Sequence, residues 1–525
     1  MNLYPWQKEC IKAWQANHYR GMVNAITGTG KTFMALYGIR FLENHLPAGA
    51  LRVKVVVPTF ALTAQWALAM QYALPDCKSR REKPGVYHSD QADDPNRKYM
   101  IYIINSARYT LARHILADIK NGYAVLLIAD ECHHCASPEN RKIFDFLSAG
   151  IDLTNKYFSL GLSATPQVLD YDTVLVPALG KEIYRYGFSE AVRKNNICKF
   201  FIYQIALSFS PEELQEYQEL TDRLAKTRQR LLACNPSLKY LDRFRFFGAL
   251  KQMAGEKNNT SQTLSALYLN LSYRRQALNH MASSRLSCLQ SLIRQLDERT
   301  RIIVFGERIK QAEMAYRLLS RQYPNQVGCY HSQMDGQARK NALARFHDGN
   351  QRILISCRAL DEGIDVPDAT VGIVLSGSSV GRQRTQRLGR ILRKQSGKHA
   401  ACLYYFYVRE STEDSVFLSD QEENAAVCDL FYSATEDAFI HPDYEAAAAA
   451  FLDEITQKES DESFINEIRC CLLAGLVRSD WLLSPDVCRE KAGQAGSQRE
   501  KNYWICMRRM AMRRNNTNKT RFTDS

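Results

Sequence analysis

The sequence has no hydrophobic run long enough to cross a lipid bilayer. Its longest apolar stretches, such as residues 124–129, fall far short of the roughly 20 residues that a membrane-spanning helix needs. The opening segment, MNLYPWQKEC, also lacks the apolar core of a secretory signal. We therefore exclude a membrane-embedded class and expect a soluble cytoplasmic protein.

Cysteine is too sparse for a disulfide scaffold. Fifteen cysteines are spread over 525 residues, which is typical of reduced thiols. Cys132, His133, His134 and Cys135 are contiguous, whereas zinc ligands are usually separated by about two to four residues so that the chain can fold around the metal. This spacing does not favour a zinc site. The sequence also contains no internal repeat and no long low-complexity tract.

Basic residues outnumber acidic ones. The 69 Lys and Arg residues exceed the 56 Asp and Glu residues by 13, an excess that favours a polyanionic partner such as nucleic acid. Residues 489–525 contain ten basic and three acidic residues, so this segment carries +7 of the excess. The segment is either a DNA contact of the helix-turn-helix type or a solvated basic tail.

The length and the patterning indicate several domains. Continuous apolar strands alternate with helical segments in two regions, which predicts α/β domains with parallel sheets over residues 1–205 and 281–420. Residues 206–280 are expected to form a helical, basic insert, and residues 421–525 a mainly helical region with the basic tail. The expected strands lie at 53–57, 100–104, 125–129, 157–162, 302–305, 352–356, 371–375 and 401–407.

The insert begins with a helix-start signal. Ser210, Pro211 and Glu213 form a capping box with proline in the first turn. Basic residues further on stand beside aromatic ones, a mixture that suits a nucleic-acid groove, although aromatics at helical spacing also suit a core. Both interpretations remain open at this point. The residues are Arg243, Phe244, Arg245, Phe246, Phe247, Lys251, Tyr273, Arg274 and Arg275.

A phosphate-binding loop is predicted at residues 27–32, TGTGKT, which follow an expected strand at 22–26. Glycines let backbone N–H groups turn towards phosphates, Lys31 would neutralise the outer phosphates, and the Thr32 hydroxyl would bind magnesium. Ala25 stands where the usual first glycine of this motif is found. The residues of this predicted site are Thr27, Gly28, Thr29, Gly30, Lys31 and Thr32.

Two carboxylates follow a second buried strand. The apolar run at 126–128 leads to Asp130 and Glu131. A carboxylate at the end of a strand parallel to the phosphate-loop strand can hold magnesium through water, and its neighbour can orient the attacking water. We predict that Asp130 binds magnesium together with Thr32, and that Glu131 is the general base.

A cluster of cations lies some 350 residues further along the chain. Residues 386–393 read QRLGRILR, and a glutamine and three arginines at this spacing need an anion to face. The phosphates held at residues 27–32 are the natural partner. Two distant halves of the chain are therefore expected to share one nucleotide.

These ordered motifs resemble the superfamily-two helicases and translocases of the DEAD/DEAH type, and within them the XPB-like and restriction-motor branch. The resemblance covers about residues 1–420. It implies two RecA-like parallel-sheet domains, with the helical insert between them and a mainly helical C-terminal region. It also rests on LYPWQ at 3–7, VVVPTFALTAQW at 55–66, INSARY at 104–109, GLSATP at 161–166, the segment from 179 to 200 and the segment from 331 to 367.

The resemblance implies roles for nucleotide-binding residues. Gln7 would read the adenine edge, and Tyr4 stands where the family often has arginine. Arg390 and Arg393 would act as arginine fingers when the two domains close on ATP. Gly363 and Asp365 would contact the nucleotide from the second domain.

The resemblance also implies coupling and strand-contacting residues. His133 in the acidic box would face Gln386, and the motif GLSATP would link hydrolysis to domain movement. The implied coupling residues are His133, Gln386, Ser163, Ala164 and Thr165. The implied nucleic-acid contacts are Pro58, Thr59, Asn105, Ser106 and His331.

The function implied is that of an ATP-dependent DNA helicase or double-strand DNA translocase, using ATP and Mg²⁺, in repair, recombination or defence against foreign DNA. The alternatives are an RNA helicase and a non-hydrolysing nucleic-acid-binding subunit of a larger assembly. A fused nuclease is not favoured, because neither Pro442-Asp443 nor Pro485-Asp486 is followed by a suitable ExK segment. A separate nuclease, or another repair or defence protein, would be the partner.

Overall fold

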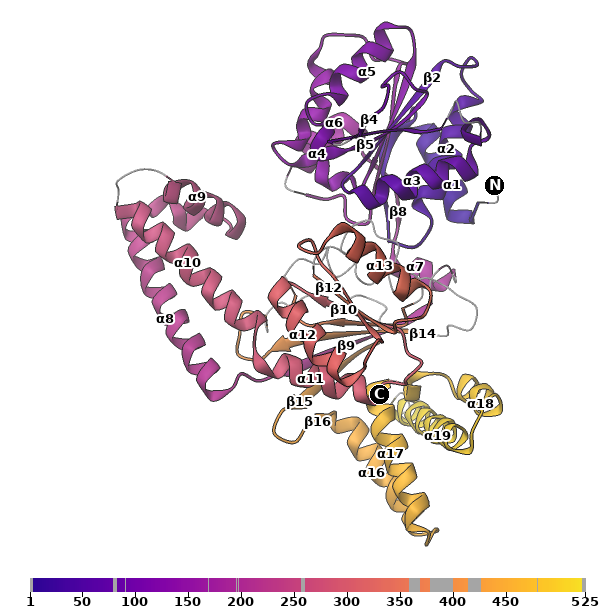
Figure 1. The fold of residues 1–525 in the computed structure, drawn as a ribbon, viewed down its shortest axis with the longest axis vertical. Coiled ribbons are helices and arrows are strands. Elements are labelled where there is room, and N and C mark those ends of the chain that lie inside the picture. Colours follow the sequence, from indigo (N-terminus) through magenta and orange to yellow (C-terminus); the bar gives the residue numbers. More distant parts are fainter. Residues whose placement is uncertain are drawn as a thin grey trace. The chain divides into compact units, whose positions relative to one another are not determined.

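The structure, a computed structural model, forms two compact units (Figure 1). The first unit contains Met1–Phe200 together with Ala359–Thr370 and Val380–Ala401, and the second contains the remaining residues from Phe201 onwards. Each unit is built around its own sheet. The residues described are 3–78, 83–89, 91–168, 170–194, 196, 198–255, 260–357, 369–377, 400–413, 426–478 and 480–521.

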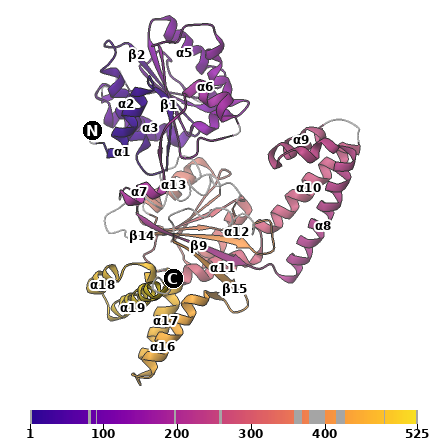
Figure 2. The ribbon, with the colours of Figure 1, turned by 180° about the vertical axis from the view of Figure 1, so that it is seen from behind.

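In the first unit, the described residues form an eight-stranded sheet in the order β4-β3-β5-β2-β6-β7-β1-β8. β4 is antiparallel to β3, and the other paired strands are parallel. β6 and β7 are buried along their whole length, because helices cover both faces of the sheet (Figures 1 and 2). The strands are β1 Arg20–Ala25, β2 Leu51–Val57, β3 Gly85–His88, β4 Gln91–Ala92, β5 Tyr99–Ile103, β6 Ala124–Asp130, β7 Tyr157–Ser163 and β8 Glu182–Tyr186.

The helices of the first unit separate these strands, as a parallel sheet requires. They are α1 Pro5–Ala16, α2 Lys31–Glu43, α3 Phe60–Ala73, α4 Ile104–Ala107, α5 Leu111–Lys120, α6 Val176–Leu179 and α7 Phe188–Arg193. Shorter helical turns lie at Pro75–Lys78, Cys132–Ala136, Asn140–Ser148 and Tyr171–Leu175.

In the second unit, the described strands follow the order β11-β12-β10-β13-β14-β9-β15-β16. β10 is parallel to both β12 and β13, and β16 is antiparallel to β15. The strands are β9 Lys199–Leu207, β10 Ile302–Gly306, β11 Val327–Tyr330, β12 Ile353–Cys357, β13 Val371–Val374, β14 Ala400–Val408, β15 Ala426–Ser433 and β16 Ala438–Ile440. Two parallel sheets with interleaved helices match the expected pair of RecA-like domains.

The helices of the second unit fall into three groups along the chain. The first group lies between β9 and β10, the second between β10 and β12, and the third after β16. They are α8 Pro211–Cys234, α9 Arg243–Gly255, α10 Thr260–His280, α11 Ser283–Gln295, α12 Ile309–Gln322, α13 Gly336–His347, α16 Pro442–Thr456, α17 Glu462–Arg478, α18 Pro485–Gly493 and α19 Gln498–Arg521. Short turns lie at Pro236–Tyr240 and Asp480–Leu482.

Three strands of the second sheet, β9, β15 and β16, were not predicted from the sequence. No strand was predicted near the end of the expected first domain at residues 1–205, and β9 there pairs in parallel with β15, with Phe201 opposite Ala426. The region 421–525 was expected to be mainly helical, and it begins with β15 and β16. β9 and β15 pair across more than 200 residues, which an apolar run considered in isolation cannot reveal, whereas β16 pairs with β15 over a short turn.

The helical insert has its own core. α8 begins at the expected capping box, in which Ser210 Oγ accepts from Glu213 N at 3.2 Å and Ser210 N donates to Glu213 Oε2 at 3.0 Å. α8 and α10 lie side by side, and α9 lies at the end away from the sheet (Figures 1 and 2). Phe246 and Phe247 pack with Leu250 in a cluster between these helices, so for these two aromatics the core interpretation is correct.

The basic C-terminal segment is a packed helix in its described part. α19 buries Tyr503, Cys506, Met507 and Met510. Arg513 makes an ion pair with Glu454 of α16 at 2.5 Å. The interpretation of this segment as a solvated tail therefore fails for residues up to 513.

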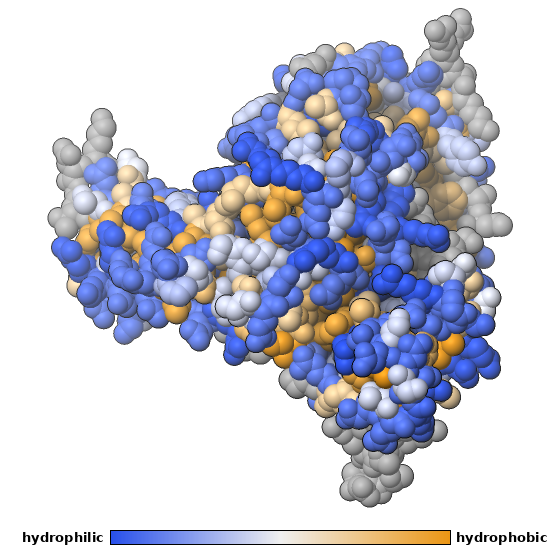
Figure 3. All heavy atoms as spheres, turned by 60° about the horizontal axis from the view of Figure 1, so that its bottom comes forward, coloured by the Kyte–Doolittle hydropathy of each residue, from blue (hydrophilic) through white to orange (hydrophobic). Residues whose placement is uncertain are grey.

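One face of the molecule is mostly polar. On the face shown in Figure 3, hydrophilic residues predominate and hydrophobic ones lie between them in smaller groups. Among the helices that the structure describes, none is both long enough and apolar enough to span a bilayer.

Candidate nucleotide site

The predicted residues of the first unit lie at one edge of its sheet. β1 ends at Ala25, β6 at Asp130 and β7 at Ser163. In the pairing register, Asn24 lies opposite Ser163 and Asp130 lies opposite Leu162, so the carboxyl ends of these strands are level. Ligands of open α/β sheets bind at this edge, where strand ends leave a crevice.

The loop after β1 has the backbone of a phosphate cradle. Gly28 and Gly30 adopt φ values of 89° and 90°, the left-handed region that favours glycine. At Gly30 a Cβ atom would also lie 2.9 Å from Gln7 Nε2, so any side chain would collide with the wall of the loop. α2 begins at the next residue, and its first N–H groups have no partner within the helix.

Side chains of the loop hold it in shape. Thr29 Oγ1 donates to the carbonyl of Ile26 at 2.8 Å. Lys31 is buried, and its Nζ donates to the carbonyl of Ala25 at 2.8 Å, across the mouth of the loop. Thr27 Oγ1 is buried and has no hydrogen-bond partner in the described part of the chain. A polar cradle with a cation and a spare hydroxyl suits a phosphate.

Gln7 connects the first helix to this loop. It is buried, its Oε1 accepts from Tyr4 N at 2.9 Å, and its Nε2 donates to the carbonyl of Gly30 at 3.0 Å. Tyr4 is 55% exposed and stands at the start of α1. The glutamine therefore fixes the position of the loop, beside an exposed aromatic ring that a planar base could stack on.

Asp130 and Glu131 occupy the end of β6. Asp130 is buried; its Oδ1 accepts from Glu131 N at 3.0 Å and its Oδ2 from Trp66 Nε1 at 2.8 Å. Burial raises the pKa of Asp130 to about 6, the nearby Glu131 carboxylate adds to the rise, and Lys31 and Trp66 oppose it. Glu131 itself has a φ of 47°, an unusual conformation for this residue type that is common at functional sites.

The acidic pair fits a divalent cation. Glu131 Oε2 is buried without a hydrogen bond in the described structure, and two carboxylates stand side by side in a desolvated pocket. Such oxygens need positive charge or water, and a hydrated Mg²⁺ supplies both. Thr32, half-buried in the first turn of α2, provides the neutral oxygen that such sites commonly add.

His133 joins the acidic segment to the end of β7. Its Nδ1 lies 3.0 Å from Ser163 Oγ and 3.5 Å from Glu131 Oε2. Ser163 Oγ also accepts from Thr165 N at 3.0 Å. Ala164, between them, is buried. The four expected coupling residues of the first unit thus form one connected group, and Gln386 lies outside the described residues.

The residues of the first unit that were predicted to contact a nucleic-acid strand follow two neighbouring β-strands. Pro58 and Thr59 follow β2, and Asn105 and Ser106 follow β5, whose ends are level because Val57 lies opposite Ile103. All four are at least partly exposed. They lie at the same edge of the sheet as the phosphate-binding loop. This edge could therefore contact both a nucleic-acid strand and a nucleotide.

The second unit places one of the predicted residues. His331, after β11, is buried, and its Nε2 lies 3.7 Å from Glu313 Oε1. Its burial is less suited to direct strand contact than the exposure of Asn105. Gly363, Asp365, Arg390 and Arg393 lie outside the described residues.

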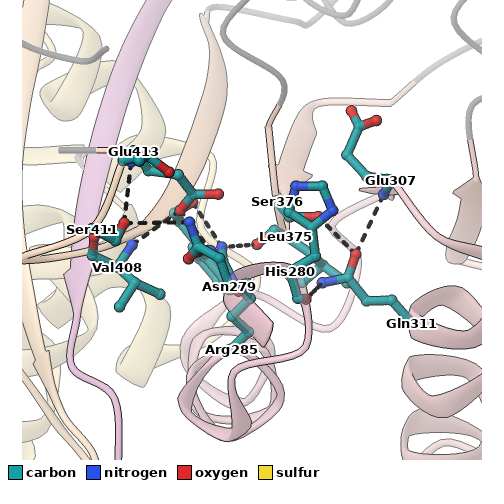
Figure 4. Close-up of polar contacts among 12 residues, drawn as sticks. Asn279, His280, Arg285, Glu307, Gln311, Leu375, Ser376, Val408, Ser411 and Glu413 are labelled. Atoms are coloured by element: carbon teal, nitrogen blue, oxygen red, sulfur yellow. Dashed lines mark hydrogen bonds and ion pairs between the residues drawn. The ribbon is translucent and has the colours of Figure 1, made fainter. Parts of the chain in front are cut away.

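A polar network that the sequence reasoning missed lies at the carboxyl edge of the second sheet (Figure 4). Arg285 of α11 is 1% exposed, and its guanidinium donates to the carbonyls of Leu375 and Phe406 at the ends of β13 and β14. It also donates to Asn279 O at 2.9 Å and Oδ1 at 3.2 Å, and to Glu413 Oε2 at 2.6 Å. A lone arginine in a helix carries no sequence signal for such a role.

Trp66 makes a contact with the nucleotide site that the sequence did not reveal. It lies in α3, within the motif VVVPTFALTAQW of residues 55–66, and its indole reaches the Asp130 carboxylate. The spacing of Leu62, Trp66 and Met70 predicts a buried helix face, but not the identity of the polar atom that the indole meets.

Comparisons with known proteins agree with this geometry. Residues 1–168 match the family described as type III restriction enzyme, res subunit, and residues 284–395 match the helicase conserved C-terminal domain. The chain is 31% identical over 401 residues to the DNA 3'-5' translocase XPB2 of Sulfurisphaera tokodaii, covering 75% of this chain and 79% of the relative.

Two further similarities are shorter or more distant. The chain is 33% identical over 85 residues to the DNA 3'-5' helicase XPB of Kineococcus radiotolerans, which is 16% of this chain and 15% of the relative. Among solved structures, the Hef helicase domain of Pyrococcus furiosus superposes with a TM-score of 0.53 at 15% identity, covering 79% of this chain and 98% of that one. This structural similarity supports the fold.

Proposed function

The chain belongs to the XPB-like branch of the superfamily-two helicases and translocases, and we propose that it hydrolyses ATP with Mg²⁺ at the carboxyl edge of the first sheet to move along double-stranded DNA. The observation that carries the proposal is the convergence of Lys31, Asp130 and Glu131 at that edge. Nucleic-acid-dependent ATPase activity follows from the family.

The phosphates would bind in the loop after β1. Backbone N–H groups at the start of α2 would face them, and Lys31 would exchange its bond to the Ala25 carbonyl for a phosphate oxygen. Asp130 and Thr32 would hold Mg²⁺, which supplies charge neutralisation at the phosphates.

Hydrolysis would then need a positioned water. Glu131 Oε2, buried and without a hydrogen-bond donor in the described structure, is the acceptor that would orient it. Arg390 and Arg393 would add charge stabilisation, and Gly363 and Asp365 further nucleotide contacts, as the family resemblance implies.

Coupling to movement would pass through His133. Its contacts join Glu131, next to the reacting phosphate, to Ser163 at the end of β7. A change of charge at the phosphate would therefore shift a hydrogen-bonded group that begins the next loop, and the family resemblance implies that Gln386 would receive that shift. Domain closure and reopening would convert it into a step.

DNA is the substrate we favour over RNA. The relative that covers most of the chain is named a DNA translocase, and the exposed residues after β2 and β5 could follow a phosphate backbone. A nuclease or another repair or defence protein is a candidate partner.

The test compares ATP turnover with duplex DNA, single-stranded DNA, RNA and no nucleic acid. We expect strong stimulation by duplex DNA, and RNA-only stimulation would contradict the DNA assignment. Glu131→Gln should abolish turnover while leaving DNA binding intact, because it removes the base but not the strand contacts. Lys12→Ala, which alters an exposed residue of α1, is the control and should behave as the unmodified protein.

A further inference from the structure

We propose that Trp66 is a positioning residue that orients the Asp130 carboxylate and transmits strand binding to the nucleotide site. The inference rests on the proposed function, because that function assigns Asp130 to Mg²⁺. It concerns a residue outside the predicted catalytic, coupling and strand-contacting sets.

The first observation is the contact itself. Trp66 is fully buried, and its Nε1 donates to Asp130 Oδ2 at 2.8 Å, while the Glu131 backbone N–H donates to Oδ1 at 3.0 Å. Each carboxylate oxygen therefore has one donor among the described residues, and its remaining lone pairs can accept from water bound to a cation. Two donors from different directions fix the plane of the carboxylate.

The chemistry of the indole suits this task. Its N–H is a donor only and carries no charge, so it cannot ligate a cation and does not compete with one for the carboxylate. A lysine or arginine here would neutralise Asp130 and weaken its interaction with Mg²⁺. Groups that orient a metal-binding carboxylate in this way commonly change metal affinity by about 10- to 100-fold when removed.

The second observation is the element that carries Trp66. α3 starts immediately after Pro58 and Thr59, the predicted strand-contacting residues, and Thr59 Oγ1 accepts from Leu62 N at 3.4 Å. Thr63 Oγ1 donates back to Thr59 O at 3.3 Å. Trp66 lies seven residues beyond the cap, about 10 Å along a helix.

A displacement at the start of α3 would therefore reach Asp130 directly. α-Helices move as rigid elements over such distances, and the buried face of α3 is held by Leu62, Trp66 and Met70. Strand binding at Pro58 and Thr59 would shift the indole and, with it, the orientation of the carboxylate. By thermodynamic linkage, if DNA binding changes the affinity for nucleotide with Mg²⁺ by some factor, then nucleotide with Mg²⁺ changes the affinity for DNA by the same factor.

The alternative is that Trp66 is only a core residue. Trp6, Trp14 and Trp66 are all fully buried in the first unit. Trp14 Nε1 donates to the carbonyl of Ser159 at 2.9 Å, and Trp6 Nε1 has no hydrogen-bond partner in the described structure. Of these three indoles, that of Trp66 is the one whose described partner is a side chain of the nucleotide site, which sets it apart from packing alone.

The experiment compares Trp66→Phe with Trp14→Phe, a matched loss of one buried indole hydrogen bond. Duplex-DNA affinity is measured in EDTA without nucleotide, and again with Mg²⁺ and a non-hydrolysed ATP analogue; ATP turnover is titrated with Mg²⁺. We expect Trp66→Phe to keep its EDTA affinity, to need about 10-fold more Mg²⁺ for half-maximal turnover, and to lose most of the nucleotide-dependent change in DNA affinity.

Trp14→Phe should change neither the Mg²⁺ requirement nor the nucleotide-dependent change. If Trp66→Phe does not fold, benzothienylalanine at position 66 keeps the bicyclic shape and lacks only the N–H donor. Equal behaviour of the two positions overturns the inference while leaving the proposed function standing. Absence of DNA-stimulated turnover in the unmodified protein instead overturns the proposed function.

Discussion

The carboxyl edges of the two sheets have the same architecture, but they differ in how their central polar side chains are paired. At the first edge, Thr27 Oγ1, Glu131 Oε2 and Thr165 Oγ1 are buried without hydrogen-bond partners among the described residues. At the second edge, the five N–H groups of Arg285 have five protein acceptors. Unpaired buried polar groups are costly, so the unpaired oxygens of the first edge suit a ligand, whereas the fully paired Arg285 suits a role in holding the fold. Glu413 Oε1, beside it, also has no hydrogen-bond partner among the described residues.

The largest effect should follow a change at the first edge. Lys31→Met should lower ATP turnover by about 10³-fold, because it removes the cation facing the developing phosphate charge. The melting temperature should not fall, since Lys31 makes one hydrogen bond in the described structure and its burial desolvates a charge. Steady-state ATP turnover checks the first expectation and calorimetry checks the second. A large loss of stability would mean that this edge, too, has a structural role.

The converse change is Arg285→Met at the second edge. We expect the free energy of unfolding of the second unit to fall by about 3–5 kcal/mol, because Glu413 would remain buried without its ionic partner. Denaturant titration measures it. Arg294→Met is the control: Arg294 is 49% exposed and pairs with Asp437, so its loss should cost at most about 1 kcal/mol. Equal losses would contradict the contrast drawn between the edges.

Asp480 offers a comparison with Asp130, since burial raises the pKa of both to about 6. Tyr503 Oη donates to Asp480 Oδ2 at 2.7 Å, Arg478 and Lys491 oppose the rise, and Asp297 adds to it. The folded state holds the proton more tightly than the unfolded state, so the free energy of unfolding should fall as the pH rises from about 4 to about 6.

Asp480→Asn should remove that part of the pH dependence. At pH 7 the variant should be more stable by at most about 3 kcal/mol, with ATP turnover unchanged, because Asp480 lies outside the nucleotide site. Thermal denaturation between pH 4 and pH 8 measures the effect. Asp486→Asn, at a side chain that is 83% exposed, should leave the pH profile unaltered. A lower stability of Asp480→Asn at pH 7 would show that the ionised carboxylate is favourable.

The contrast also explains what the sequence could reveal. The loop at 27–32, Asp130, Glu131 and the Ser163 segment follow buried strands, and contiguous motifs of this kind can be recognised because the chemistry restricts each position. Arg285, Trp66 and β9 escaped prediction because their partners lie far along the chain: Glu413 is 128 residues from Arg285, and Asp130 is 64 residues from Trp66. Nothing local distinguishes a buried arginine that satisfies strand ends from an exposed one.

The smallest expected effect tests whether His133 and Ser163 at the first edge couple ATP hydrolysis to movement. Ser163→Ala removes the hydroxyl that meets His133 Nδ1 and accepts from Thr165 N. A hydrogen bond of this kind contributes about 1 kcal/mol, so the ATP consumed per translocation event should rise about fivefold, with turnover itself little changed. Triplex displacement measured together with phosphate release gives that ratio.

Ser159→Ala is the control. It removes a hydroxyl of the same β-strand that donates to Leu179 O, away from His133, and it should leave the ratio unaltered. If both variants consume ATP as the unmodified protein does, His133 and Ser163 are neighbours without a coupling role, and the link from hydrolysis to movement must pass through another contact of Glu131.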